Sequence, residues 1–165
     1  MKRRHFVVVI VIFLILAWFS IGVMASLPNK LPLAANFLLV MVIEILLTNK
    51  LTLLSFNFKL FEINTSSIPH FLSMILQNDI TVTFILLTYV NVFLTASKAS
   101  TRWGISAYGF LFQMFIGAML RWYSVLTYTG WNFLMEAVMI IALMSCTLLT
   151  GRFFQRMITK EGWIR

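Results

Sequence analysis

A single carboxylate, Glu44, lies inside the apolar run ANFLLVMVIEILLTNK of residues 35–50. A charged side chain at the centre of a spanning helix costs about 2.5 to 3.5 kcal/mol on insertion scales, so its presence needs an explanation. Two hypotheses account for it. In the first, Glu44 belongs to a surface through which helices pack. In the second, it is a proton or cation site in a translocation path.

Polar side chains recur at helical spacing in the other apolar runs as well. At about 100° per residue, Glu44, Thr48 and Ser55 fall on one side of their helix. Three later runs have similar faces, formed by Thr81, Thr88, Asn91 and Thr95, by Ser106, Gly109, Gln113 and Gly117, and by Glu136, Thr147 and Thr150. Membrane helices pack through such faces, because small residues allow close approach and polar ones bond across. The sequence therefore predicts a bundle with a polar seam, and its candidate intramembrane polar site comprises Glu44, Thr48, Asn91 and Gln113.

Arg121 and Glu136 are equidistant from the turn signal YTG at residues 128–130. Residues at equal distances from a tight turn lie at about the same depth on antiparallel helices, so opposite charges there can pair. The spacing predicts an Arg121–Glu136 charge pair. The alternative is that Arg121 extends to the interfacial aromatic residues beside Trp122.

Residues for catalysis or metal binding are scarce. The chain has five acids, one cysteine (Cys146) and two histidines (His5 and His70), too few for a His-based metal site or an internal disulfide. It lacks HExxH, GxSxG, a paired-aspartate cluster and a glycine-rich phosphate loop. We therefore expect no catalytic residues, no metal site and no cofactor. Asn78 and Asp79 have the character of a helix start, where a short acceptor caps free N–H groups.

The composition defines the class of protein. Hydrophobic residues make up 61% of the chain and charged residues 11%, with a mean hydropathy of +0.93. Soluble domains carry roughly 25% charged residues. The net charge of +8 comes from basic residues scattered at the ends of apolar runs, which is typical of topology determinants and not of a nucleic-acid surface. These features predict an integral membrane protein.

Dividing 165 residues by the roughly 20 that one spanning helix needs gives four to six helices. We predict an all-α polytopic bundle of about five transmembrane helices forming a single membrane domain over residues 1–165. The candidate spans are 6–25, 31–54, 80–97, 104–126 and 131–151, with an interfacial or re-entrant connector at 55–79 and a basic amphipathic tail at 152–165. The first span could also be a signal peptide, but its apolar length favours an uncleaved anchor. Because it lacks a polar face, it should lie at the periphery.

The distribution of Lys and Arg creates a parity problem. Basic residues accumulate on the cytoplasmic side, so the N-terminal KRR, Lys98 with Arg102, and the tail should all be cytoplasmic. Three candidate spans separate Arg4 from Lys98, and an odd number of crossings cannot return the chain to its starting side. Either residues 31–54 enter without crossing, or residues 51–77 hide another crossing, or the charge rule fails at one end.

Because no motif names a substrate or a reaction, the sequence predicts only a broad class of function. We expect a non-catalytic integral membrane protein, an accessory or assembly subunit that acts through helix–helix contacts with other membrane components. Its partners would be the lipid bilayer and a membrane protein or further copies of itself, without nucleic acid. The alternative is a small oligomeric transporter or channel whose polar seam includes Glu44. The residue bias and short loops suggest a multi-pass protein of a bacterial cell membrane.

Overall fold

The computed structural model describes residues 2–28, 30–65 and 67–160. It is 81% helical, which confirms the predicted all-α class. Within the described residues, five helices are long and apolar enough to cross a membrane, as predicted. The elements in chain order are α1 (Lys2–Ala25), α2 (Leu33–Leu51), the π-helix η1 (Thr52–Asn57), β1 (Phe61–Ile63), α3 (Ile68–Ile75), the π-helix η2 (Leu76–Val82), α4 (Thr83–Thr95), α5 (Ala99–Trp122), β2 (Leu126–Tyr128) and α6 (Phe133–Lys160).

The predicted connector at 55–79 is wrong over its second half. Its last residues belong to one continuous helix, α3–η2–α4, which we call the central helix (Ile68–Thr95). This helix begins after Ser67, whose backbone is extended, and carries a proline in its first turn. Proline suits that position, because its missing N–H would have no helical partner there. Asp79 is consequently an interior residue of a spanning helix and not the start of one.

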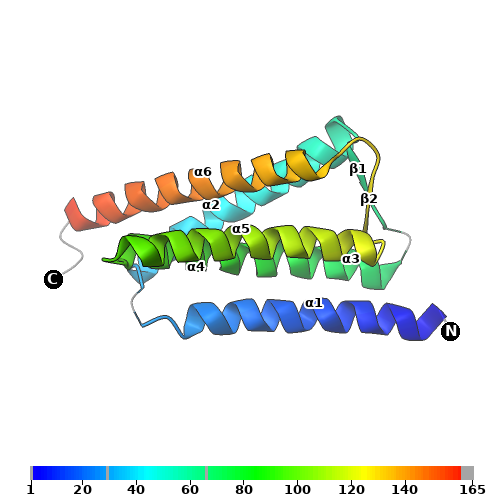
Figure 1. The fold of residues 1–165 in the computed structure, drawn as a ribbon, viewed down its shortest axis with the longest axis horizontal. Coiled ribbons are helices and arrows are strands. Elements are labelled where there is room, and N and C mark those ends of the chain that lie inside the picture. The colour runs from blue at the N-terminus through cyan, green and yellow to red at the C-terminus, as the bar shows by residue number, and fades with distance from the viewer. Residues whose placement is uncertain (1, 29, 66, 161–165) are drawn as a thin grey trace.

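The central helix contacts each of the other four long helices. It is also the most buried of the five long helices, because 61% of its most apolar 18-residue stretch is buried inside the protein. One side is covered by α1 through a stripe spaced three or four residues apart, formed by Val9, Phe13, Ala17, Ser20 and Met24. Figure 1 shows α1 along one edge of the bundle, in agreement with its predicted peripheral place.

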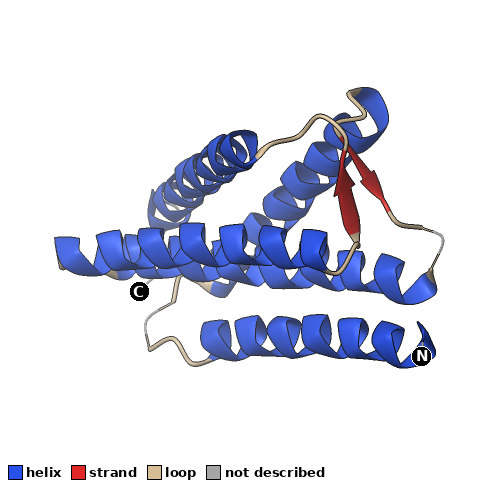
Figure 2. Cartoon of the chain, turned by 45° about the vertical axis from the view of Figure 1, so that its right-hand side comes forward, coloured by secondary structure: helices blue, strands red, loops and turns tan. Residues whose placement is uncertain are grey.

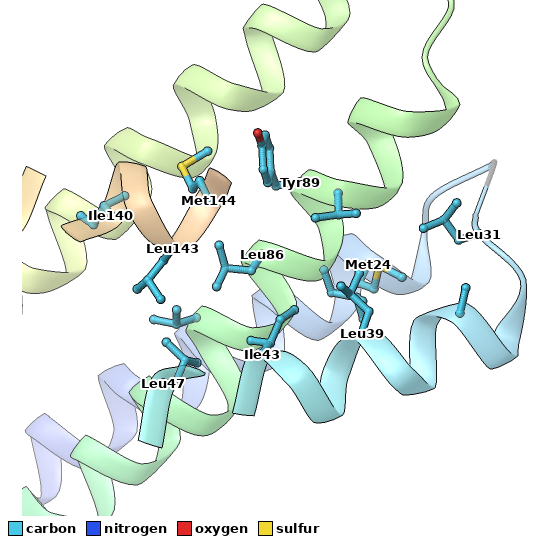
Figure 3. Packing of buried hydrophobic residues seen from close by; sticks show 14 of the residues in the cluster. Met24, Leu31, Leu39, Ile43, Leu47, Leu86, Tyr89, Ile140, Leu143 and Met144 are labelled. Carbon is cyan, nitrogen blue, oxygen red and sulfur yellow. The ribbon is translucent and has the colours of Figure 1, made fainter. Parts of the chain in front are cut away.

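Buried apolar side chains form two clusters. The first, shown in Figure 3, joins α2, α4 and α6 through residues such as Leu39, Leu86 and Leu143. The second lies around the first half of α1, the start of the central helix and the end of α5, and includes Phe13, Met74 and Leu120. The buried stripe of α2 is entirely apolar and consists of Ala35, Leu39, Ile43 and Leu47. Its packing face therefore lies beside the predicted polar face.

A two-stranded antiparallel sheet joins the loop after η1 to the loop after α5, with Phe61 opposite Tyr128 and Ile63 opposite Leu126 (Figure 2). The Leu60 carbonyl accepts backbone N–H groups of three consecutive residues, 129–131, at 3.0 to 3.1 Å. Ser124 reverses the chain between α5 and β2 with a positive φ of 54°. These contacts hold the two loops together at one end of the bundle.

The five long helices distribute the described basic residues between both ends of the bundle. Figure 1 places the N-terminus at the end that carries β1 and β2, whereas the α4–α5 turn and the end of α6 lie at the opposite end. Residues 33–57 are long and apolar enough to cross a membrane, and the described residues between 58 and 67 contain a loop and β1. If all five helices cross, the basic residues at the two ends cannot all lie on one side, which corresponds to the third explanation for the parity problem.

Candidate functional site within the spans

Glu44 lies near the middle of its span and binds the central helix. Its Oε1 accepts a hydrogen bond from the Thr83 hydroxyl at 2.7 Å. Glu44 follows Leu33 by 11 residues, which corresponds to about 16 Å along the helix axis, or half the bilayer core. Its side chain is half-buried at the edge of the apolar stripe of α2. The carboxyl group therefore joins α2 to the central helix and keeps one side accessible.

A second acid, Asp79, lies beside this contact. It follows Ile68 by 11 residues, so it also lies about 16 Å from the end of its helix. Asp79 is exposed, and its Oδ1 accepts a hydrogen bond from the neighbouring Asn78 amide at 2.8 Å. Thr83, which donates to Glu44, follows Asp79 by four residues, or about one helical turn. The structure thus brings two carboxylates into one region of the spans.

The backbone around Asp79 is π-helical. π-helical turns interrupt α-helices rarely and occur frequently at functional sites. In η2 the Thr81 hydroxyl donates to the Leu76 carbonyl, five residues earlier, at 3.1 Å. The segment directs Gln77 and Asn78 into the protein, each 5% exposed, and Asp79 outward. It therefore divides its polar side chains between the interior and the surface of the bundle.

The outward side is a groove of about 720 Å³ between α2–η1, β1 and the first half of the central helix. We call it the acidic groove. Asp79 and Asn78 lie in it near mid-span, and Lys59 and Glu62 line it near β1. The remaining lining residues are Thr48, Leu51, Thr52, Ser55, Phe56, Ile63, Thr65, Phe71, Met74 and Ile75. A groove that has apolar walls and a carboxylate near mid-span suits an occupant that is mainly apolar and carries a polar or cationic group.

The inward side is a small cavity of about 40 Å³, large enough for a water molecule. Its polar lining comprises Lys50, Gln77, Asn78, Gln113, Tyr128 and Glu136. The Gln77 side-chain oxygen is buried without a hydrogen-bond partner. Asn78, Leu51 and Met74 line both the cavity and the acidic groove, so these side chains form the wall between them.

Glu136 is held by the last residue of β2 and by a residue of the loop that follows it. Its Oε2 accepts hydrogen bonds from the Tyr128 hydroxyl at 2.5 Å and from the Trp131 indole N–H at 2.7 Å. Gly117 leaves space for the carboxylate, since a Cβ there would lie 3.3 Å from Glu136 Oε1. Burial of the phenol, reinforced by its bond to this carboxylate, raises the pKa of Tyr128 above its usual value.

The structure shows no direct ion pair between Arg121 and Glu136 in the part of the chain that it describes. Both residues instead contact Tyr128. The Arg121 guanidinium carbon lies 4.9 Å from the centre of the Tyr128 ring, whose hydroxyl donates to Glu136. Both side chains thus lie close to Tyr128, at the same end of the bundle. The prediction from spacing missed Tyr128, because nothing in the sequence indicates that the turn folds back between them.

The candidate polar residues do not form one site. Asn91 is fully engaged in packing: its Oδ1 accepts the Leu31 backbone N–H at 2.7 Å, and its amide donates to Asn36 Oδ1 at 2.7 Å and to the Leu87 carbonyl at 2.8 Å. Gln113 is buried beside the cavity and donates to the Gly109 carbonyl at 3.1 Å. Thr48 is exposed and lines the groove. Thr48 therefore lines the groove and Glu44 lies about one turn before it on the same helix, whereas Asn91 and Gln113 lie elsewhere.

Sequence reasoning missed the roles of Asp79, Gln77 and Tyr128. The available signal was the SIP sequence at residues 67–69, which is typical of a helix start and would have placed Asp79 inside the span. Among the described residues, no group of three or more His, Cys, Asp or Glu side chains has the geometry to hold a metal ion.

These features define an all-α, multi-spanning membrane protein with a mid-span acidic groove. Comparisons of the chain with protein-family models, with curated proteins and with solved structures found no match.

Proposed function

We propose that the protein is a non-catalytic membrane subunit that binds a spanning helix of another membrane protein in the acidic groove, by means of a basic side chain on that helix. The observation that carries the proposal is the exposure of Asp79 at mid-span in a groove with apolar walls. Ionisable side chains at this depth normally face a bundle interior or pair with another group. A partner with Lys or Arg would supply that pairing.

The described part of the chain shows no cation bonded to either carboxylate. Among the described residues, no Lys or Arg forms an ion pair with Asp79 or Glu44, whose polar contacts come from Asn78 and Thr83. Lys59 lines the same groove but lies near β1, where the groove approaches the end of the bundle. A spanning helix packed along α2 and the central helix would bring its own basic residue to the two carboxylates. Apolar residues on the same helix would cover Phe56, Phe71 and Ile75.

Transport is the second candidate, and the shared wall between the cavity and the groove favours it. A path through Asn78 would connect Glu136, which lines the cavity, with Asp79, which lines the groove. The other half of the bundle argues against a path within one chain, because the apolar cluster around Leu39, Leu86 and Leu143 fills it. A conducting form would therefore need several copies. Proton uptake by liposomes containing the protein, lost on Glu44→Gln, would support this candidate over the subunit proposal.

The proposal is tested by photo-crosslinking in native membranes. A photoreactive amino acid replaces Phe71 or Ile75 in the groove, and replaces Leu111, an exposed residue of α5, as the position control. We expect the groove positions to capture a membrane protein through one of its spanning helices, and we expect that helix to contain Lys or Arg. The Leu111 position should not capture it.

Asp79→Asn removes the charge and keeps the size of the side chain. Crosslinking should then fall about tenfold, a loss within the range for a hydrogen bond to a charged group. Glu62→Gln, which removes a carboxylate near β1 in the same groove, is the matched control and should retain the product. Unchanged crosslinking in Asp79→Asn, capture of a second copy of this chain, or a captured helix without a basic residue would each overturn the proposal.

A further inference from the structure

Three arginines from two helices converge at the end of the bundle opposite the sheet. Arg102 lies in the first turn of α5, and Arg152 and Arg156 lie one turn apart near the end of α6. Together with Phe93, Leu94 and Gln155, they line a pocket of about 260 Å³. We infer that this pocket, which we call the arginine pocket, binds the phosphate headgroup of an anionic membrane lipid.

Two of the guanidinium groups are held in place before any ligand binds. Arg102 donates from Nε and Nη2 to the Ala96 carbonyl at 3.0 and 2.8 Å. The guanidinium carbons of Arg102 and Arg152 lie 5.9 and 5.7 Å from the centre of the Phe93 ring. The common contact with Phe93 holds both charges at one site. Such preorganisation lowers the conformational entropy that binding costs.

The charge of the pocket is unbalanced. No Asp or Glu lines it, so three like charges are gathered without a counter-ion from the described part of the chain. Arginine presents several N–H donors in a planar arrangement that matches the oxygen atoms of a phosphate. A bound phosphate would relieve the repulsion among the three arginines and accept several charge-assisted hydrogen bonds.

The depth of the pocket identifies a lipid as the source of the phosphate. Arg152 follows Phe133 by 19 residues, which corresponds to about 28 Å along α6 and to the thickness of a bilayer core. The pocket therefore lies at the level of the headgroups. Its volume is below the roughly 300 to 1,000 Å³ of pockets that enclose drug-sized ligands. A headgroup fits while the acyl chains remain in the membrane.

Native mass spectrometry of the purified full chain tests the inference. The protein in mild detergent is titrated with phosphatidylglycerol, with phosphatidylcholine as the zwitterionic comparison, and with inorganic phosphate as a separate competitor. We expect saturable binding that prefers phosphatidylglycerol. The double change Arg102→Gln with Arg152→Gln should weaken this binding by on the order of tenfold or more, since two charge-assisted contacts are lost.

The control removes the same amount of charge at the same end of the bundle. Lys30→Gln with Lys98→Gln alters residues that do not line the pocket and should change phosphatidylglycerol binding less than twofold. If the double arginine variant does not fold, Arg156→Gln alone serves, because its exposed side chain makes none of the helix contacts described above. Equal binding of the two lipids, equal losses in the arginine and lysine variants, or full displacement by inorganic phosphate would overturn the assignment.

Discussion

The two halves of the bundle satisfy their polar groups in different ways. In the half away from the sheet, Asn91 binds Leu31, Asn36 and Leu87, and Thr147 donates to carbonyls of its own helix. In the half that carries β1 and β2, the protein leaves a cavity with the unpartnered Gln77 oxygen and a groove with the exposed Asp79. Thr88, whose buried hydroxyl lacks a partner, is the exception in the first half.

The two halves therefore differ in how strongly their polar groups should contribute to stability. Polar groups that are saturated within the chain contribute to packing and have nothing left to offer a ligand. Polar groups left exposed or unpartnered in the spans lower stability unless something else binds them. We call the first region the packed half and the second the open half. Substitutions of buried residues in the packed half should therefore lower stability strongly, whereas those of polar residues in the open half should lower it less. The arginine pocket, at the outer end of the packed half, is not part of this division.

The largest expected effect is that of Gly151→Ala in the packed half. A Cβ at Gly151 would overlap Cγ1 of the fully buried Val90, so α6 would have to move away from α4. We expect a loss of about 3 kcal/mol in the free energy of unfolding, as for overpacked cores. Gly104, with no atom within 4 Å of its Cβ position, is the control. Gly104→Ala should stabilise its helix slightly, and destabilisation of both variants to the same extent would refute the argument.

Asn91→Leu should cost about 2 kcal/mol. The substitution leaves the Leu31 N–H and the Asn36 Oδ1 without the hydrogen bonds that Asn91 provides. The expected loss is moderate, because individual hydrogen bonds within membranes are weak. Gln113→Leu in the open half removes only a bond to the preceding turn of its own helix and should cost about 0.5 kcal/mol. Unfolding in a denaturing detergent series would measure both. Equal losses would contradict the division into two halves.

Tyr128→Phe should cost about 1 kcal/mol at neutral pH, the contribution of one hydrogen bond. Because the folded protein raises the pKa of Tyr128, the neutral phenol contributes stability below about pH 10, and this contribution is lost as the pH rises through the folded pKa. The wild-type protein should therefore lose stability above pH 10 more steeply than the Phe variant. Thermal unfolding at pH 8 and pH 11 compares the two, and parallel pH profiles would show that Tyr128 is not the group responsible.

The smallest effect is expected for Glu44→Gln. The amide retains an oxygen that can accept the Thr83 hydrogen bond, so stability should change by less than about 0.5 kcal/mol. Thr48→Ala, at an exposed position on the same helix, should be equally mild. A loss above 1 kcal/mol for Glu44→Gln alone would mean that the charge of Glu44 also stabilises the packed state.

The sequence was sufficient for the elements that depend on one chain segment. Long apolar runs predicted five helices, and the spacing of Gly109, Gln113 and Gly117 predicted a face that the structure buries. It was insufficient where several segments meet. The apolar stripe of α2 could not be distinguished from its lipid face, because both are hydrophobic. Neither the π-helical turn at Asp79 nor the insertion of Tyr128 between Arg121 and Glu136 follows from helical periodicity.

The sheet has a consequence for the order in which the protein is made. β1 leaves the ribosome before the central helix and α5, whereas β2 follows α5, so the two strands can pair only after these helices have been synthesised. At about 5 to 20 residues per second, that interval lasts several seconds. Lys59, Glu62 and Ile63, which form one wall of the acidic groove, are unsupported during this time. The groove is therefore completed only late in biosynthesis, after α5 has been synthesised.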